Sequence, residues 1–428
     1  MRALQFMADP EPRTETRIPL PRPLGPSERE TCEELPEDAP KLLRNLATTP
    51  MALVDLPDPP LLGDDWLVLR TRVTGICGSD AKQVLMDFDG GADNMMTAFI
   101  SFPQVLGHEV VAMVDEAGPA VGGVEPGQRV VLYPNLGCRA RGITPLCPAC
   151  ARGDYPICAN FHAGPLSAGI HTGNAVEATG GFAERLPAHE TMAVPIPDGV
   201  DDEVAVLADP WSVSFHAITR NPPAADARAV VYGAGALGST ATAILRQLYP
   251  SVEVATVARW PSQADHAARL GAEVFTPEPV EELVEALAAW SGATLRRPWE
   301  GLPVAYPGQV DVVYDTVGSP ATTEVALRVL REQGTLVQLG VSAPGRFEWT
   351  PWYFKELRLV GSNAFGDETF EGRRRHAYEH YFDLLADGRI DLSGMLTHRF
   401  RLEEWREAFS SLVHQGETGA IKVAFDFR

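Results

Sequence analysis

The stretch Ala229-Val-Val-Tyr-Gly233-Ala-Gly235-Ala-Leu-Gly238 decides the fold of this chain. Four residues that suit a buried strand run into three glycines with G-x-G-x-x-G spacing, and a helix-forming run follows over 236–248. The first glycine permits a tight turn, the second leaves room for a pyrophosphate, and the third lets helix and strand pack closely. The stretch therefore predicts a dinucleotide site. We expect its cofactor-binding residues to be Gly233, Gly235, Ala236, Leu237 and Gly238.

Strands alternate with helices along the rest of this region. Short strand-like runs at 252–257, 310–314 and 335–339 are separated by helical patterns, one of them over 263–270. Buried strands joined by helices are typical of a doubly wound parallel sheet. An α/β domain is therefore predicted from residue 211 to residue 365.

The part of the chain before Pro210 has a different pattern. Residues 1–6, 66–73, 105–114 and 128–133 read as short strands separated by glycine and proline turns. The segment 9–50 is rich in proline and glutamate, and we expect an irregular excursion with one helical turn near its end. The first part is therefore predicted to be β-rich. The tail after residue 365 returns to mixed helix and strand.

Four cysteines gather between residues 138 and 158. Three of them follow the pattern C-x2-C-x7-C, and the fourth stands nine positions earlier. Four thiolates complete a tetrahedral zinc shell with no position left for water. A redox C-x-x-C pair is the competing interpretation. We predict a structural zinc held by Cys138, Cys147, Cys150 and Cys158.

A second metal site is predicted from Gly-Ile-Cys77-Gly-Ser79-Asp and Gly-His108-Glu109. Cysteine and histidine suit zinc, and a site with an open position supports catalysis. The third ligand is left open between Glu109 and Asp209. Zinc in such a site polarises an alcohol or carbonyl oxygen. Ser79 is placed to carry the alcohol proton outward.

The end of the second strand of the α/β domain bears on the choice of cofactor. NAD sites place an acidic residue there for the ribose 2′-hydroxyl, but this chain reads Thr-Val-Ala-Arg259-Trp. Arg259 stands where a cation would pair with a 2′-phosphate. NADP(H) is therefore favoured over NAD(H), the alternative being that Arg259 is a solvated loop residue.

Composition sets wider limits. The chain has 428 residues, enough for two domains, and its 45% hydrophobic content is ordinary for a globular protein. A net charge of −21 disfavours nucleic acid and anionic membranes as partners, because phosphate binding needs clustered cations. No apolar run suits a membrane span or a secretory signal. We predict a cytoplasmic protein whose six cysteines serve metal rather than disulfides.

Together these motifs resemble the zinc-containing medium-chain dehydrogenases, the alcohol and polyol dehydrogenase superfamily. The resemblance runs from about Leu67 to Val423 and includes the Cys77 and His108 turns, the cysteine lobe and the Gly233 turn. It implies a GroES-like catalytic domain, residues 1–210 and 366–428, split around a Rossmann domain at 211–365. It also implies a homodimer or homotetramer.

The resemblance extends to the site residues. It implies that Cys77, His108 and Asp209 hold the catalytic zinc, with Glu109 a ligand in some relatives. It further implies that Gly340 and Val341 contact the nicotinamide, and that Lys422 lies near a basic residue that some relatives aim at the pyrophosphate. Lys82 stands where many relatives have a relay histidine, which is a departure.

The predicted function is zinc-assisted hydride transfer between NAD(P) and an alcohol or carbonyl substrate. Three alternatives stay open. One is reduction of an activated C=C or C=N bond on the same scaffold. Another is a lyase or isomerase that keeps a bound nucleotide without net redox change. The last is a nucleotide-sensing protein without turnover, which has no need of two zinc sites.

Overall fold

A computed structural model describes residues 1–6, 17–18, 33–34, 39–87, 98–343 and 345–428. The chain divides into two compact units. The first comprises Met1–Asp209 and Leu396–Arg428, and the second comprises Pro210–Met395. Most of the proline-rich segment 9–50 lies outside the described residues. Its described part holds the strands β2 (Arg17–Ile18) and β3 (Glu33–Glu34) and the helix α1 (Lys41–Thr48).

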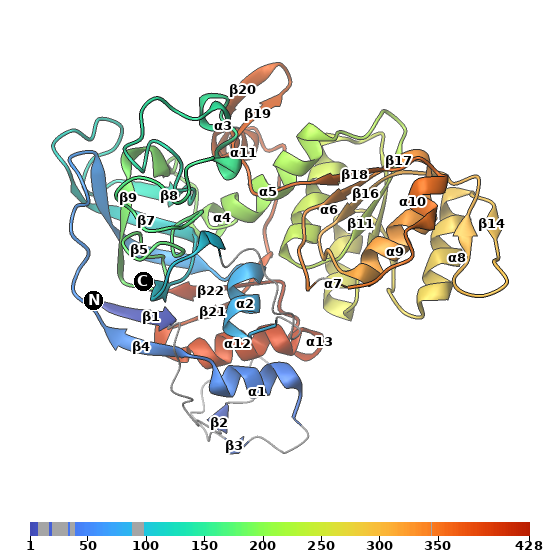
Figure 1. The fold of residues 1–428 in the computed structure, drawn as a ribbon, viewed down its shortest axis with the longest axis horizontal. Coiled ribbons are helices and arrows are strands. Elements are labelled where there is room, and N and C mark those ends of the chain that lie inside the picture. The colour runs from blue at the N-terminus through green and yellow to red at the C-terminus, as the bar shows by residue number, and fades with distance from the viewer. Residues whose placement is uncertain (7–16, 19–32, 35–38, 88–97, 344) are drawn as a thin grey trace. The chain divides into compact units, whose positions relative to one another are not determined.

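The first unit is built on β-sheets, as the sequence predicts (Figure 1). Its largest sheet has the order β10-β8-β7-β5-β22-β21, and β9 also pairs with β5. The strands are β5 (Trp66–Gly75), β7 (Glu109–Ala117), β8 (Arg129–Leu132), β9 (Arg185–His189), β10 (Ala193–Pro195), β21 (Leu396–Phe400) and β22 (Lys422–Asp426). A smaller sheet joins β1 (Arg2–Phe6), β4 (Met51–Asp55) and β6 (Gln104–Val105).

Short helices and two large apolar cores complete the first unit, and a smaller apolar cluster surrounds the four lobe cysteines. The helices are α1, α2 (Gly78–Val84), α3 (Pro148–Ala151), α4 (Asp202–Ala205), α12 (Trp405–Val413) and α13 (Gln415–Thr418). One core packs α1 and α12 against β1 and β22 around Phe182, Phe409 and Phe425. The other lies on β5, β7 and β8 and contains Trp66. Residues of β5 lie in the second core, together with residues far from them in the sequence.

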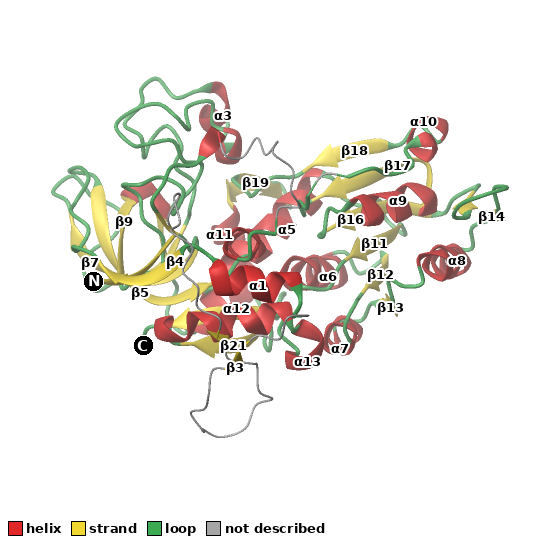
Figure 2. Ribbon diagram, turned by 60° about the horizontal axis from the view of Figure 1, so that its bottom comes forward, coloured by secondary structure: helices red, strands yellow, loops and turns green. Residues whose placement is uncertain are grey.

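The second unit is a six-stranded parallel sheet flanked by helices (Figures 1 and 2). The strand order is β13-β12-β11-β16-β17-β18, and each neighbouring pair is parallel. The strands are β11 (Arg228–Tyr232), β12 (Glu253–Val257), β13 (Glu273–Phe275), β16 (Val310–Asp315), β17 (Leu330–Gln338) and β18 (Arg358–Gly361). The chain runs outward from β11 to β13 and then returns to β16, so strand order reverses between β11 and β16. The predicted doubly wound sheet is confirmed.

The helices of the second unit follow the predicted alternation. They are α5 (Ala208–Arg220), α6 (Ala236–Leu248), α7 (Pro261–Arg269), α8 (Val280–Ser291), α9 (Pro320–Val329), α10 (Thr350–Phe354) and α11 (Ala377–Ala386). Two hairpins, β14–β15 (Leu295–Arg296 with Val304–Ala305) and β19–β20 (Asp367–Phe370 with Arg373–His376), complete the unit. Within the described ranges, no helix is long and apolar enough to cross a membrane.

The second unit extends further along the chain than the predicted boundary at residue 365. Residues 366–395 belong to it because they pack on α5. The rings of Trp211 and Tyr381 lie 5.2 Å apart, and the buried carboxylate of Glu368 accepts hydrogen bonds from His216 at 2.5 Å and Arg220 at 2.9 Å. The return to the first unit therefore comes at Leu396, not at residue 366.

The glycine turn gives a testable contrast within the second unit. A Cβ on Gly238 would stand 1.9 Å from the carbonyl oxygen of Gly233, while a Cβ on Gly235 meets no atom within 4 Å. We expect Gly238→Ala to lower the free energy of unfolding by about 1–3 kcal/mol, because the helix must move away from the strand. Gly235→Ala, at the N-cap of α6, should change it by less than about 1 kcal/mol. Thermal unfolding of both variants tests this contrast, and equal melting temperatures would contradict it.

Candidate active site

The four lobe cysteines lie together in the first unit. Their Sγ atoms are all within 4.8 Å of one another, all four residues are buried, and none forms a disulfide. The Sγ of Cys138 is 3.6 Å from that of Cys158 and accepts a hydrogen bond from the Asn160 amide at 3.1 Å. The Cys147 side chain caps the short helix α3 by accepting from the Cys150 backbone N–H. Donation of N–H groups to sulfur stabilises thiolates, which are the form that binds metal.

This arrangement fits a structural zinc better than a redox pair. A redox site needs two cysteines, whereas here four sulfur atoms converge in a buried cluster. Four buried thiols in so small a space would repel one another once ionised, and a divalent cation removes that repulsion. Cys138, despite its wide spacing from Cys147, belongs to the cluster.

The second group of donors forms where β5 and β7 pair. Gly75 at the end of β5 lies opposite Glu109, the first residue of β7. Cys77 follows two residues after Gly75, and His108 precedes Glu109, so strand pairing brings the three donors together. Their ligand atoms lie within 4.8 Å of one another, with His108 and Glu109 buried and Cys77 half-buried. Soft, borderline and hard donors with one partly open side suit a catalytic zinc.

Asp80 organises two of these donors. Cys77 is the N-cap of α2, and the Asp80 carboxylate accepts a hydrogen bond from its backbone N–H at 3.0 Å. The same carboxylate lies 3.5 Å from Nδ1 of His108. Burial opposes ionisation of Asp80, but the neighbouring His108 lowers the pKa of this carboxyl overall. Burial likewise opposes protonation of His108, yet Asp80 and Cys77 raise the pKa of His108, so the site favours positive charge.

Lys422 lies beside Glu109 rather than exposed to solvent. Its ammonium forms a buried ion pair with the Glu109 carboxylate and donates a hydrogen bond to the Ile76 carbonyl at 3.1 Å. Burial disfavours this charge, but Glu109 and Cys77 raise the pKa of Lys422 above its ordinary value. A pyrophosphate contact, as the resemblance implies, would have to break this pair.

The remaining predicted residues of the first unit lie around this group. Asp209 is buried in the first turn of α5 and contributes to raising the pKa of Lys422, but its carboxylate is not among the three grouped donors of the described chain. Ser79 is exposed in the first turn of α2, two residues beyond Cys77. The structure thus groups Glu109, not Asp209, with Cys77 and His108.

His171 is a neighbour of the donor group that the sequence did not single out. Its ring centroid lies 4.6 Å from that of His108, with the planes at 46°. Burial and the adjacent His108 lower the pKa of His171 to about 4, which keeps this imidazole neutral at neutral pH. The turn Gly-Ile-His171-Thr-Gly carries no metal-ligand spacing that would have indicated it.

The predicted nucleotide residues of the second unit lie at the carboxyl ends of its strands. The turn from Gly233 to Gly238 follows β11, Arg259 follows β12, and Gly340 with Val341 follows β17. Gly233 has a φ of 99°, which favours glycine, and Gly235 borders open space. Ala236 and Leu237 begin α6, whose N-terminus offers free N–H groups to phosphates. Strand order reverses at this edge, where dinucleotides bind in such sheets.

Arg259 is exposed at this same edge. Its guanidinium lies over the ring of Trp260, 4.9 Å from the centroid. Val341 is exposed and Gly340 is buried. The geometry leaves Arg259 accessible to a phosphate group.

Family models match both units. Residues 63–198 match the alcohol dehydrogenase GroES-like domain, and residues 236–385 match the zinc-binding dehydrogenase domain. The (R,R)-butanediol dehydrogenase of Saccharomyces cerevisiae is 28% identical over 387 residues, which cover 86% of this chain and 93% of that protein. The L-galactonate-5-dehydrogenase of Escherichia coli K12 is 28% identical over 352 residues, covering 82% and 88%.

Solved structures agree with this fold. The 2R,3R-butanediol dehydrogenase from Bacillus subtilis aligns with a TM-score of 0.68 at 20% identity, over 88% of this chain and 96% of that one. A zinc-binding dehydrogenase from Sinorhizobium meliloti 1021, solved bound to NADP, aligns with a TM-score of 0.65 at 27% identity, over 90% and 97%. This chain belongs to the zinc-containing medium-chain dehydrogenase/reductase superfamily and is an NAD(P)-dependent oxidoreductase of the alcohol and polyol dehydrogenase type.

Proposed function

We propose that this protein oxidises a secondary alcohol that carries a second hydroxyl or another polar group close by, with NADP+ as hydride acceptor. The observation that carries the proposal is the buried grouping of Cys77, His108 and Glu109 at the β5–β7 pairing. The substrate class rests on the relatives, whose names specify butanediol, galactonate, arabinitol and threonine dehydrogenases.

In this proposal Cys77, His108 and Glu109 hold the catalytic zinc. Zinc, when bound, supplies a Lewis acid that polarises the substrate oxygen and lowers the pKa of the alcohol. Asp80 keeps Cys77 and His108 in place by its contacts to both. The exposed hydroxyl of Ser79 moves the alcohol proton to solvent. The Gly233 turn and the N-terminus of α6 bind the cofactor pyrophosphate.

Asp209 takes a supporting role. Its buried carboxylate adds negative charge near Lys422 and thereby helps to hold the Lys422–Glu109 pair. Glu109 is the third donor at rest because its ligand atom is already grouped with those of Cys77 and His108. Asp209 would replace it only after a rearrangement of the pair.

Two further parts of the proposal concern the zinc count and the compartment. Cys138, Cys147, Cys150 and Cys158 hold a second, structural zinc, so each chain carries two ions.

The expected compartment is the cytoplasm. It is supported by the free thiols of all five described cysteines, since a reducing compartment maintains them.

The metal assignment is tested by removing one ligand at a time. We expect about two zinc ions per wild-type chain. Cys77→Ser should lose one zinc and at least about 100-fold in kcat/KM for 2,3-butanediol, since the Lewis acid is lost while the fold remains. Cys150→Ser should lose the other zinc and lower the melting temperature. Elemental analysis beside steady-state NADPH formation measures both effects. Full metal content and turnover in Cys77→Ser would refute the catalytic assignment.

The cofactor preference is tested at Arg259. The exposed guanidinium is proposed to pair with the 2′-phosphate, in line with the NADP-bound relative. Loss of a charge-assisted contact costs about 1.5–3 kcal/mol, so Arg259→Ala should raise KM for NADP+ by about 10–100-fold and leave KM for NAD+ unchanged. Arg269→Ala, in the last turn of α7, serves as the matched control. Equal effects on both cofactors would contradict the preference.

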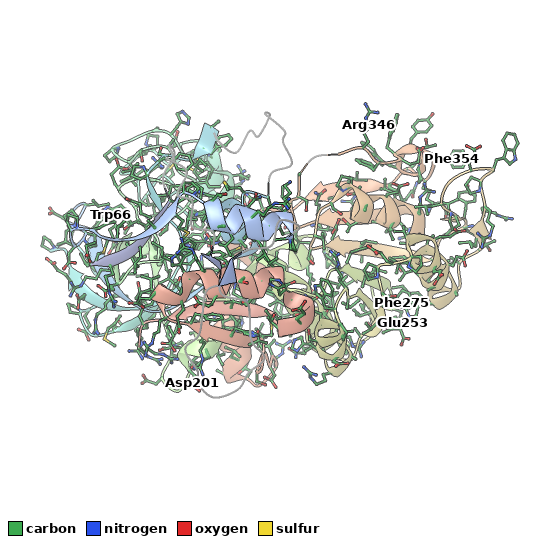
Figure 3. All side chains as sticks on the ribbon, turned by 90° about the horizontal axis from the view of Figure 1, so that it is seen from below. Trp66, Asp201, Glu253, Phe275, Arg346 and Phe354 are labelled. Atoms are coloured by element: carbon green, nitrogen blue, oxygen red, sulfur yellow. The ribbon has the colours of Figure 1, made fainter. Side chains whose placement is uncertain are left out.

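A second copy of the chain is the proposed partner of the second unit. The edge strand β18 and the preceding helix α10 expose an apolar rim, and Figure 3 shows Phe354 at the outside of this unit. The rim consists of Trp349, Trp352, Tyr353, Phe354 and Leu359. An unpaired strand edge with so much exposed apolar surface indicates a covered interface, and a two-fold axis would pair β18 with its copy.

The partner assignment is tested by sedimentation. Leu359→Asp should raise the dimer dissociation constant at least about tenfold, because a charge placed opposite its own copy repels it. Val176→Asp, at an exposed apolar position of the first unit, is the control and should leave association unchanged. A wild-type protein that is monomeric at micromolar concentration would refute the interface.

A further inference from the structure

His171 contacts a proposed metal ligand without being one. Its imidazole lies against that of His108, with ring centroids 4.6 Å apart. Nδ1 of His108 also lies 3.5 Å from the Asp80 carboxylate, and the Cys77 side chain is within hydrogen-bonding reach of the same imidazole. The His108 ring is therefore contacted by the Asp80 carboxylate and by a second imidazole, and both contacts limit how it can turn.

The orientation of the His171 ring is itself fixed. Its Nδ1 lies 2.7 Å from the carbonyl oxygen of Thr172. Because a carbonyl only accepts hydrogen bonds, Nδ1 is the donor, and the ring is tied to the backbone of the next residue. A ring held in this way presents a constant surface to His108.

Backbone contacts hold the chain around His171 against residues 134–136, just before the cysteine lobe. His171 forms an isolated antiparallel bridge with Asn135. Thr172 donates its N–H to the Pro134 carbonyl at 2.8 Å, and Leu136 donates to the Ile170 carbonyl at 3.1 Å. The position of His171 is thus set by the chain just before Cys138.

Arg141 connects the two backbone segments that meet at His171. It lies in the wide interval between Cys138 and Cys147 and is fully buried. Its Nε donates to the Leu136 carbonyl at 3.0 Å. Its two terminal nitrogens donate, at 2.8–3.0 Å, to the carbonyls of Ala163, Leu166, Ser167 and Gly169. The five N–H groups of the guanidinium therefore donate to two backbone segments, one at Leu136 and one at 163–169 that runs into His171.

We propose that His171 is a positioning residue for His108, and that Arg141 holds it in place. This inference builds on the proposed function, in which His108 is a ligand of the catalytic zinc. The contact works through ring packing, so the shape of the side chain at position 171 matters more than its nitrogen atoms. The wide spacing after Cys138 then has a purpose, because it accommodates the residue that connects the cysteine lobe to the donor group.

A measurement of zinc affinity distinguishes a positioning role of His171 from a general effect on the stability of the protein. His171→Ala should weaken catalytic zinc at least about tenfold, the usual size for groups that orient metal ligands. Zinc is titrated with a chelator in the full-length protein, and Cys77→Ser identifies the ion that belongs to the catalytic group. In the same variant with Co2+ at this site, the visible absorption band should shift. The structural zinc should stay bound.

His171→Phe is the decisive comparison. Phenylalanine keeps a ring in contact with His108 but has no nitrogen, so catalytic zinc affinity should stay within about threefold of wild type. If His171→Phe is as impaired as His171→Ala, or if His171→Ala binds zinc as the wild type does, the proposal is wrong. His189→Ala removes another buried histidine of this unit, one that bonds Asp65 and Thr191, and should lower the melting temperature without moving zinc affinity.

The contribution of Arg141 is tested by a double-mutant cycle. Arg141→Lys keeps the charge but replaces five planar donors by three, so it should weaken catalytic zinc in the same direction as His171→Ala. If Arg141 acts through His171, combining both changes should add no further loss. Additive losses would overturn that link. Failure of the proposed function is distinguishable, because Cys77→Ser would then keep its zinc and its turnover.

Discussion

The pairing of β5 with β7 on one side and β22 on the other is the constraint on which the donor group depends. Gly75, at the end of β5, lies opposite Glu109 on β7 and Ala424 on β22. The chain then turns into Cys77, while His108 enters β7 and Lys422 begins β22. Residues from three distant parts of the sequence therefore meet at one strand end. A register slip of one residue would turn Glu109 to the opposite face of the sheet and separate it from the other donors.

Charge balance explains why this buried group is tolerable. Isolated charges are costly to bury, so each must find a partner of opposite sign. Glu109 pairs with Lys422, and Asp80 faces His108. The anions outweigh the cations, since Asp209 adds negative charge in the same region. This excess of negative charge raises the pKa values of His108 and Lys422, and a bound divalent cation would balance it.

Local patterns made much of the molecule predictable. The Gly233 turn and the alternation of strands and helices indicated the α/β fold, because both patterns are visible in short stretches of sequence. The grouping of the four cysteines was predictable because they lie within 21 residues, from 138 to 158. The extent of the second unit was not, since residues 366–395 join it through Trp211 and Glu368 contacts that no local pattern contains. His171 was missed for the same reason.

The third metal donor shows where sequence reasoning reaches its limit. Glu109 and Asp209 are both acidic, and the resemblance implies a ligand position for both, so residue type alone does not choose between them. The choice depends on tertiary geometry. Glu109 is fixed by the β5–β7 register beside Cys77, whereas Asp209 enters from the first turn of α5, a hundred residues further on. The choice also depends on Lys422. Its ammonium is paired with the Glu109 carboxylate, and the negative charge of Asp209 helps to raise the pKa of Lys422. The proposed choice of Glu109 as the resting ligand therefore rests on strand register and on the neighbouring charges, neither of which residue type reveals.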